Sequence, residues 1–361
     1  MAPNAFPWHE RIRAGRDRTV ALGKVAYQRY ARLFWAAHSA WALFTGGVVL
    51  VLAHNRYGFL PWVILFLTLT WASTLFFSRF AVGRDSARLR FAHGFVSYIT
   101  RVMYQETLFF LLPFYFYSTT FPSWNSGYVV VLAGLAVLSC FDMVFDPLLR
   151  TRRPFTVGFF AVVTYSALQF FLPLVLHVQI HNGAYLAAAL AFFASLPMAY
   201  SWQELRQPRR LALFALSLAA IIGVLKVGRA LIPPVPLRLS AMSFAAGIDP
   251  TTLRLDRELS RVVSAAELPH GRLCVRATIF SPGRLPVRAR LRFLRDGKLL
   301  KTSRPLDLVA HRRGFRVWDA LRGSPEGLTP GLYRVEVWTG EGQLVGRGDI
   351  RITRESVKGA F

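Results

Sequence analysis

The stretch RTRRPFTVGFFAVVTYSALQFFLPLVLHVQIHNGAYLAAALAFFASLPMAYSWQELRQPRR, residues 150–210, decides the fold class of this chain. Two apolar runs within it, 155–176 and 183–203, contain no Asp, Glu, Lys or Arg. The gap between them, 177–182, has no Lys or Arg, whereas three Arg residues lie on each outer flank. A helix needs about 20 predominantly apolar residues to cross the hydrocarbon core of a bilayer. The stretch therefore predicts two membrane-spanning helices whose basic ends face the same side.

The same alternation extends over residues 1–236. Seven apolar runs have the length of a span: 33–53, 57–78, 102–121, 126–145, 155–176, 183–203 and 211–232. Because backbone polar groups that face lipid must be satisfied within their own segment, each run should be helical throughout. Counted in alternate segments outside the runs, and without Arg101 at the border of the third run, Lys and Arg number 17 on one side and one on the other. The positive-inside rule then predicts a bacterial inner-membrane protein with a cytoplasmic N-terminus, and the odd number of spans places residues 237–361 in the periplasm.

The formal net charge of +25 has two parts. Residues 1–236 carry +14, most of which the predicted topology explains; the basic cytoplasmic segment 1–32 either lies on anionic lipid head groups or only fixes the orientation. Residues 237–361 carry +11, which the topology does not explain. A periplasmic location argues against nucleic acid and favours an anionic lipid head group, an acidic envelope glycan or a partner protein. The alternative is a solvated basic surface without a ligand.

The outer region, residues 237–361, has the pattern of a β-domain. Four segments alternate apolar with polar residues, as strands with one buried face do: 272–281, 287–295, 331–339 and 344–352. Directly after the second segment, Asp296-Gly297 predicts a two-residue hairpin turn. The pattern predicts a single β-sandwich, close to an immunoglobulin-like fold. Arg-rich strand faces are usually the solvated side of such a sheet.

Ionisable residues inside the apolar runs are candidates for function, because each is costly in lipid. Five polar residues of the third and fourth runs should face one another near the cytoplasmic side: Arg101, Gln105, Glu106, Asp142 and Asp146. In one interpretation, Glu106 is a proton or cation site and Arg101 binds an anionic head group. In the other, the five residues form an ion-pair and hydrogen-bond cluster that only fixes helix packing.

A second group of candidates lies in the outer region, where Arg residues neighbour aromatic ones: Arg313, Arg316, Trp318 and Trp338. Such pairs are common in binding hot spots. The alternative is a core Trp beside solvated Arg. The sequence has no nucleophile elbow, zinc-binding His-Glu-x-x-His or phosphate-binding loop. Cys140 and Cys274 belong to different regions, so no disulfide, metal site or cofactor is expected.

Two sets of motifs resemble known families. RVMYQETLFFLLPF at 101–114 and FDPL at 145–148 are similar to an uncharacterised family of bacterial multi-pass membrane proteins, domain of unknown function 5924. GFRVW at 314–318 and PGLYRVEVWTGEG at 330–342 are similar to a β-domain, domain of unknown function 2914. The resemblance covers about 90–361. It implies the two-part architecture, and it implies no activity or site residues.

These observations favour a non-enzymatic membrane protein that presents a basic β-sandwich in the periplasm for an anionic ligand or a partner protein. The alternative is a transporter or proton-coupled protein built on the polar residues of the third and fourth runs. A lipid-modifying enzyme has no nucleophile or metal set to support it.

Overall fold

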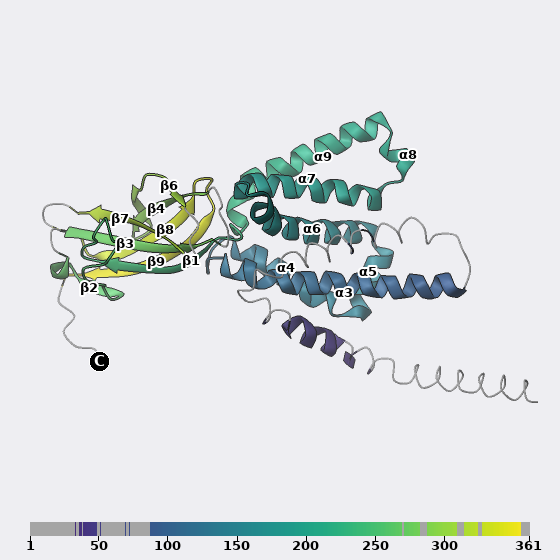
Figure 1. The fold of residues 1–361 in the computed structure, drawn as a ribbon, viewed down its shortest axis with the longest axis horizontal. Helices are drawn as coiled ribbons and strands as arrows, with labels where there is room; N and C mark the ends of the chain where they lie inside the picture. Colours follow the sequence, from purple (N-terminus) through teal and green to yellow (C-terminus); the bar gives the residue numbers. More distant parts are fainter. Residues whose placement is uncertain are drawn as a thin grey trace, which may run out of the picture.

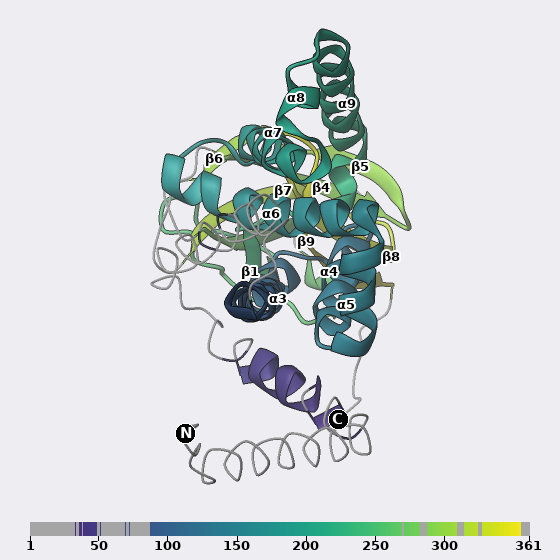
Figure 2. The ribbon, with the colours of Figure 1, turned by 90° about the vertical axis from the view of Figure 1, so that its right-hand side faces the viewer.

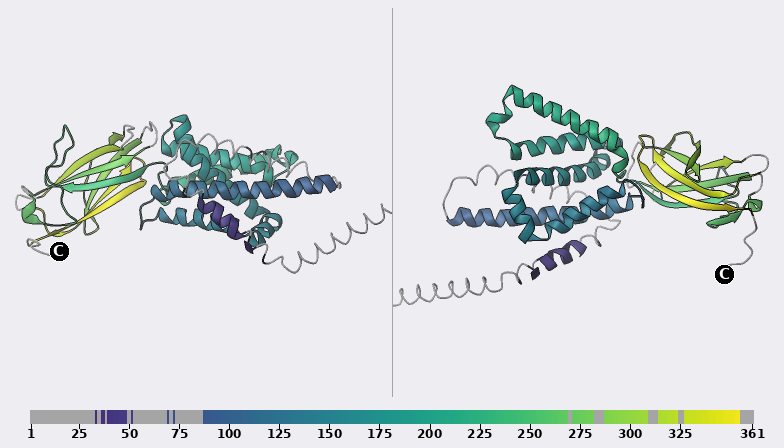
Figure 3. Two further views of the ribbon diagram at one scale, coloured as in Figure 1. Left: turned by 60° about the horizontal axis from the view of Figure 1, so that its bottom comes forward. Right: turned by 180° about the vertical axis from the view of Figure 1, so that it is seen from behind.

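The computed structural model describes residues 33, 36–37, 39–48, 51, 69, 72, 87–268, 271–281, 287–308, 314–323 and 327–354. A helical part is followed by a β-rich part, which lies at one end of the helices (Figure 1). Figure 3 shows the same arrangement from two further directions. The expected cytoplasmic segment 1–32 lies outside the described residues, as does the expected span 57–78 apart from residues 69 and 72. Of the expected span 33–53, residues 33, 36–37, 39–48 and 51 are described, and 39–48 is helical.

The helical part contains six helices of ten residues or more in the described region after residue 86. They are α3 (Ala87–Tyr117), α4 (Ser126–Ser139), α5 (Asp142–Thr151), α6 (Arg153–Leu176), α7 (Ile180–Ala199) and α9 (Pro208–Val227), with short α8 (Trp202–Leu205) and η2 (Gly228–Leu231). α6 packs along α7, and α3 along α4. Figure 2 shows α9 at the outside of the helical part, away from α3.

Three helices of the described region are long and apolar enough to cross a membrane: Arg153–Leu176, Ile180–Ala199 and Pro208–Leu231. They match three of the expected apolar runs. α4 and α5 together satisfy the same test, so the number rises to four if this bent pair is one span. The last helix ends at Leu231 because the prolines that follow lack the N–H that would continue it.

The expectation that 126–145 is one uninterrupted helix is wrong. α4 ends at Ser139 and α5 begins at Asp142, and the two axes differ by 99°. The bend places Phe145 of α5 in contact with aromatic rings of α6, and its side chain has no exposed surface. Buried packing and ion pairs of α5 therefore offset the hydrogen bonds that the break removes.

The third run also differs from its expected limits. α3 begins at Ala87, before the expected start of 102, and it ends at Tyr117 rather than at 121. The helix therefore ends about one turn before the expected limit.

The β-rich part forms two sheets. The strands are β1 (Arg238–Ala245), β2 (Val262–Ser264), β3 (Arg272–Phe280), β4 (Val287–Arg295), β5 (Lys298–Thr302), β6 (Leu306–Leu308), β7 (Phe315–Arg322), β8 (Gly331–Thr339) and β9 (Leu344–Thr353). The first sheet has the order β1-β3-β7, and the second has the order β2-β9-β8-β4-β5, with β6 also paired to β4. The four strands expected from alternation correspond to β3, β4, β8 and β9.

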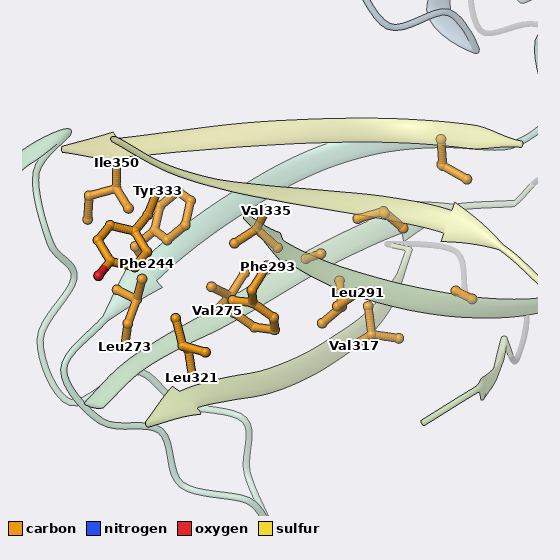
Figure 4. Packing of buried hydrophobic residues seen from close by; sticks show 14 of the residues in the cluster. Phe244, Leu273, Val275, Leu291, Phe293, Val317, Leu321, Tyr333, Val335 and Ile350 are labelled. Carbon is orange, nitrogen blue, oxygen red and sulfur yellow. The ribbon is translucent and has the colours of Figure 1, made fainter. Parts of the chain in front are cut away.

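One apolar core joins the two sheets (Figure 4). Val275 and Val317 enter it from the first sheet, and Phe293 and Val335 enter it from the second. The predicted turn at Asp296-Gly297 is confirmed, since the φ angles are 48° and 82°, as a tight hairpin turn requires. Period-two alternation therefore identified which face of these strands is buried.

The β-rich part is docked onto the ends of the helices. Asn125 Nδ2 donates a hydrogen bond to Leu344 O at 3.2 Å, and Arg229 Nη1 donates to Glu341 O at 2.9 Å. Gln343 Nε2 donates to Ile232 O at 3.0 Å. The turn between β8 and β9 and the first residue of β9 thus contact two separate segments of the helical part. One is the gap before α4, which contains no Lys or Arg, and the other is the end of η2.

Candidate functional site

The polar cluster of the helical part is centred on Arg101 in α3. Its Nη1 atom lies 3.1 Å from Asp142 Oδ1 and 2.5 Å from Asp146 Oδ1. The two aspartates are four residues apart on α5, so both carboxylates project from one helix face. The three side chains are 12%, 9% and 21% exposed, respectively, so the guanidinium compensates two largely desolvated carboxylates.

The other two expected members of the cluster lie elsewhere. Gln105 Nε2 donates a hydrogen bond to Ala42 O at 2.7 Å, which ties α3 to helical residues 39–48. Glu106 is half-buried and takes no part in the ion pairs of Arg101 among the described residues. The structure therefore brings three of the five residues together. This arrangement can hold α3 against α5, and it leaves Glu106 as a separate carboxyl group.

The four candidate ligand-binding residues of the outer region do not form one site. Arg313 lies outside the described residues. Arg316 and Trp318 belong to β7 of the first sheet, whereas Trp338 belongs to β8 of the second sheet. Their chain neighbours Val317 and Val337 are buried in the core between the sheets. Arg316 and Trp318 therefore point outward from the first sheet, and Trp338 points outward from the second, on opposite sides of the core. The grouping inferred from the sequence is corrected accordingly.

The two tryptophans have different surroundings. Trp318 packs against a small cluster that consists of Ala245, Ile248, Cys274 and Ala320. Trp338 is partly exposed; its Nε1 donates to Glu336 Oε2 at 2.8 Å, and the Arg292 guanidinium carbon lies 4.6 Å from its ring centroid. Trp338 and Arg292 thus make a cation–π pair on the outer face of the second sheet.

A polar groove that the sequence did not indicate lies between β1 and β9. Its volume is about 630 Å³, and its walls include residues 239–244 of β1, 345–349 of β9, 258–261 and 119–121. Gly348 lets the two strands approach, because a Cβ atom there would lie 2.6 Å from Met242 Sδ. Glycines inside a strand often mark such close approaches. In the sequence, Gly346 and Gly348 were the features that could have indicated this groove. We call this cavity the β1–β9 groove.

The groove is polar because two strand edges line it and charged side chains stand at its rim. Arg347 Nη2 lies 3.5 Å from Phe121 O, at the end next to the helices. Glu258 and Arg261 line the other end. Asp349 accepts two hydrogen bonds from Arg334 at 2.8 and 3.2 Å, which raises the pKa of that arginine. Asp349 is therefore already engaged, whereas Arg347 has no ion-pair partner among the described residues.

Comparison with known proteins identifies the family of this chain. Residues 16–274 match the model of a family described as Family of unknown function (DUF5924), and the chain belongs to this family. The match includes all of the described helices and ends within β3. No curated protein matches the sequence. The expected similarity of the outer region to domain of unknown function 2914 stays a prediction.

Proposed function

We propose that this chain is a multi-pass protein of the bacterial inner membrane that presents a basic, immunoglobulin-like β-sandwich in the periplasm. Seven transmembrane helices anchor it, with the N-terminus in the cytoplasm. The β-sandwich binds an anionic envelope glycan, a lipid head group or a partner protein. The single observation that carries the proposal is the distribution of 17 Lys and Arg residues on one side of the apolar runs against one on the other.

The placement of the β-rich part supports this orientation. Its contacts at Asn125 and Ile180 lie in gaps 122–125 and 177–182, which contain no Lys or Arg. The Arg-rich segments around 150–153 and 206–210 follow α5 and α8, which lie at the far end of the helices (Figure 1). A bilayer between these two ends would separate the β-rich part from the basic segments.

The second sheet supplies a basic surface for an anionic ligand. Along β4, Arg288, Arg290 and Arg292 alternate with buried residues and face outward. Arg292 also stacks on Trp338, which holds its guanidinium group in place. A guanidinium group donates paired hydrogen bonds to carboxylate and phosphate oxygens, so this face suits acidic glycans and lipid head groups.

Reporter fusions at Phe361 test the topology. Alkaline phosphatase should be active there and green fluorescent protein should be dark; the reverse result would invert the orientation and remove the periplasmic ligands. Ligand binding is tested by capture of envelope lipids and glycans with the detergent-solubilised full-length protein. The double variant R290Q/R292Q should capture less, and R209Q, on an exposed Arg of the helical part, is the matched control.

A transporter or proton-coupled function remains a second proposal because of the break between α4 and α5. Discontinuous helices with an acidic residue at the break occur at the ion sites of transporters. Here Asp142 begins α5 directly after the break and contacts Arg101. The variant E106Q distinguishes the two proposals. If the helices are only an anchor, E106Q should leave ligand capture unchanged. If the protein is proton-coupled, E106Q should lose the transport activity while still inserting correctly into the membrane.

A further inference from the structure

Two grooves of different character meet at the end of α3. The first is the β1–β9 groove, which is polar. The second is apolar, has a volume of about 650 Å³ and lies between α3 and α4. Leu112 and Phe116 of α3 and Val129 and Ala133 of α4 line it. We call it the α3–α4 groove. Each volume falls within the range of about 300–1,000 Å³ that small-molecule sites occupy.

Aromatic side chains join the two grooves. Tyr117 lines both of them. Phe116 lines the α3–α4 groove, and its ring centroid lies 5.5 Å from that of Tyr117 and 5.2 Å from that of Phe121. Phe121 lines the β1–β9 groove. These three rings form a short aromatic bridge, so an elongated molecule can follow one groove into the other.

One guanidinium group stands at the junction. Arg347 lines the β1–β9 groove, and its Nη2 atom lies 3.5 Å from Phe121 O. The acidic residues nearest this part of the groove are already engaged: Asp349 accepts from Arg334, and Glu336, the cross-strand neighbour of Arg347, accepts from Trp338. Positive charge is therefore available where the apolar groove ends and the polar groove begins.

We infer that the two grooves together bind one phosphate-bearing lipid. An acyl chain occupies the α3–α4 groove, and the head group enters the β1–β9 groove with its phosphate against Arg347. Only an amphiphile matches an apolar groove that continues into a polar one, and the planar guanidinium fork suits phosphate. Glu258 and Arg261, at the far end, are placed to contact the distal part of the head group. The inference rests on the proposed function and adds a lipid site that is distinct from the Arg-rich face of β4.

The test uses the delipidated full-length protein in detergent, titrated with phosphatidylglycerol and followed by native mass spectrometry. The wild-type protein should bind one phosphatidylglycerol molecule more tightly than uncharged diacylglycerol. The variant R347Q should weaken this binding by about tenfold, the loss of one charge-assisted contact. R351Q, at an exposed Arg of the same strand that lines neither groove, is the matched control and should leave binding unchanged.

The acyl-chain groove is tested separately. A133F introduces a ring into the α3–α4 groove and should reduce phosphatidylglycerol binding at least tenfold, whereas V130F, at a 66% exposed position of the same helix, should not. Thermal melting and gel filtration of each variant exclude misfolding. Free glycerol 3-phosphate should compete poorly, because it lacks the chain that fills the α3–α4 groove.

Three results would overturn the inference in different ways. If phosphatidylglycerol binds but R347Q and A133F match their controls, the site is wrong and the proposed function stands. If diacylglycerol binds as tightly as phosphatidylglycerol, phosphate recognition is wrong. If glycerol 3-phosphate competes as well as the lipid, the acyl-chain groove is not used. Failure of the full-length protein to capture any anionic lipid or glycan would instead remove the proposed function itself.

Discussion

Replacing Arg101 by Gln should destabilise the helical part by about 3 kcal/mol, because it removes the guanidinium group that pairs with both Asp142 and Asp146. Deleting one partner of a buried ion pair costs about 3–5 kcal/mol, since the remaining charge is left desolvated. Asp142 is 9% exposed and should carry most of this cost. Asp146 is 21% exposed and recovers part of its hydration, which places the expected loss at the lower end.

The companion variants separate charge from packing. D146N alone should cost less, about 1 kcal/mol, because Arg101 keeps Asp142 as its partner. Combining R101Q with D142N should be less destabilising than the sum of the single changes, since the desolvated Asp142 side chain is then neutral and Asp146 alone has lost the Arg101 guanidinium. R209Q, an exposed arginine of α9, is the control and should change the free energy of unfolding by less than about 0.5 kcal/mol.

The measurement is the free energy of unfolding in mixed micelles, obtained from a denaturing-detergent titration that is followed by circular dichroism. A loss in R101Q no greater than that in R209Q would refute the argument, because the cluster would then contribute nothing to helix packing. If R101Q were as stable as the wild type but lacked transport activity, the transport proposal would be favoured instead. Strictly additive effects in the double variant would show that Arg101 and Asp142 do not interact.

Three further predictions follow from single residues. F145A should lower the free energy of unfolding by about 3–5 kcal/mol in the same titration, because the buried ring fills a cavity against α6, whereas V144A, at an exposed position, should cost less than 1 kcal/mol. G297A should lower the stability of the β-rich part by about 1 kcal/mol through its φ of 82°, measured by hydrogen exchange of β4 and β5; an unchanged protection pattern would contradict this. Hydrogen bonds from the Thr252 hydroxyl and the Thr251 N–H lower the pKa of Asp249, so its stabilising contribution is present above its unfolded-state pKa and is lost as the pH falls through the folded-state value. D249N should therefore show a smaller fall in melting temperature than the wild type between pH 6 and 3, and parallel curves would refute this assignment.

Much of the fold was predictable because it depends on local periodicity. The helices α6, α7 and α9 follow from apolar runs whose length matches their extent. The strands β3, β4, β8 and β9 follow from period-two alternation, and the hairpin at Asp296-Gly297 follows from residues that tolerate positive φ. Arg101 and the two aspartates were also found from sequence, since four-residue spacing places side chains on one helix face.

The break between α4 and α5 was not predictable from hydropathy. Residues 126–145 are apolar enough for one helix, and the bend follows from where Phe145 and Asp142 find their partners on α6 and α3. The separation of the two candidate tryptophans has a related cause. Trp318 and Trp338 are similar in sequence context, but strand order assigns them to different sheets. Pairing of distant segments decides such outcomes, and no local pattern encodes it.

The sequence by itself determined which segments are apolar helices, which are strands, which strand faces are buried, and how basic charge is distributed between the gaps. Each of these depends on the transfer of nearby side chains and backbone groups between water and an apolar environment. Only the tertiary structure decided that the β8–β9 turn docks onto Asn125 and Arg229, and that the α3–α4 and β1–β9 grooves meet at Tyr117. These features join residues more than 100 positions apart, and their geometry arises only when separate elements pack together.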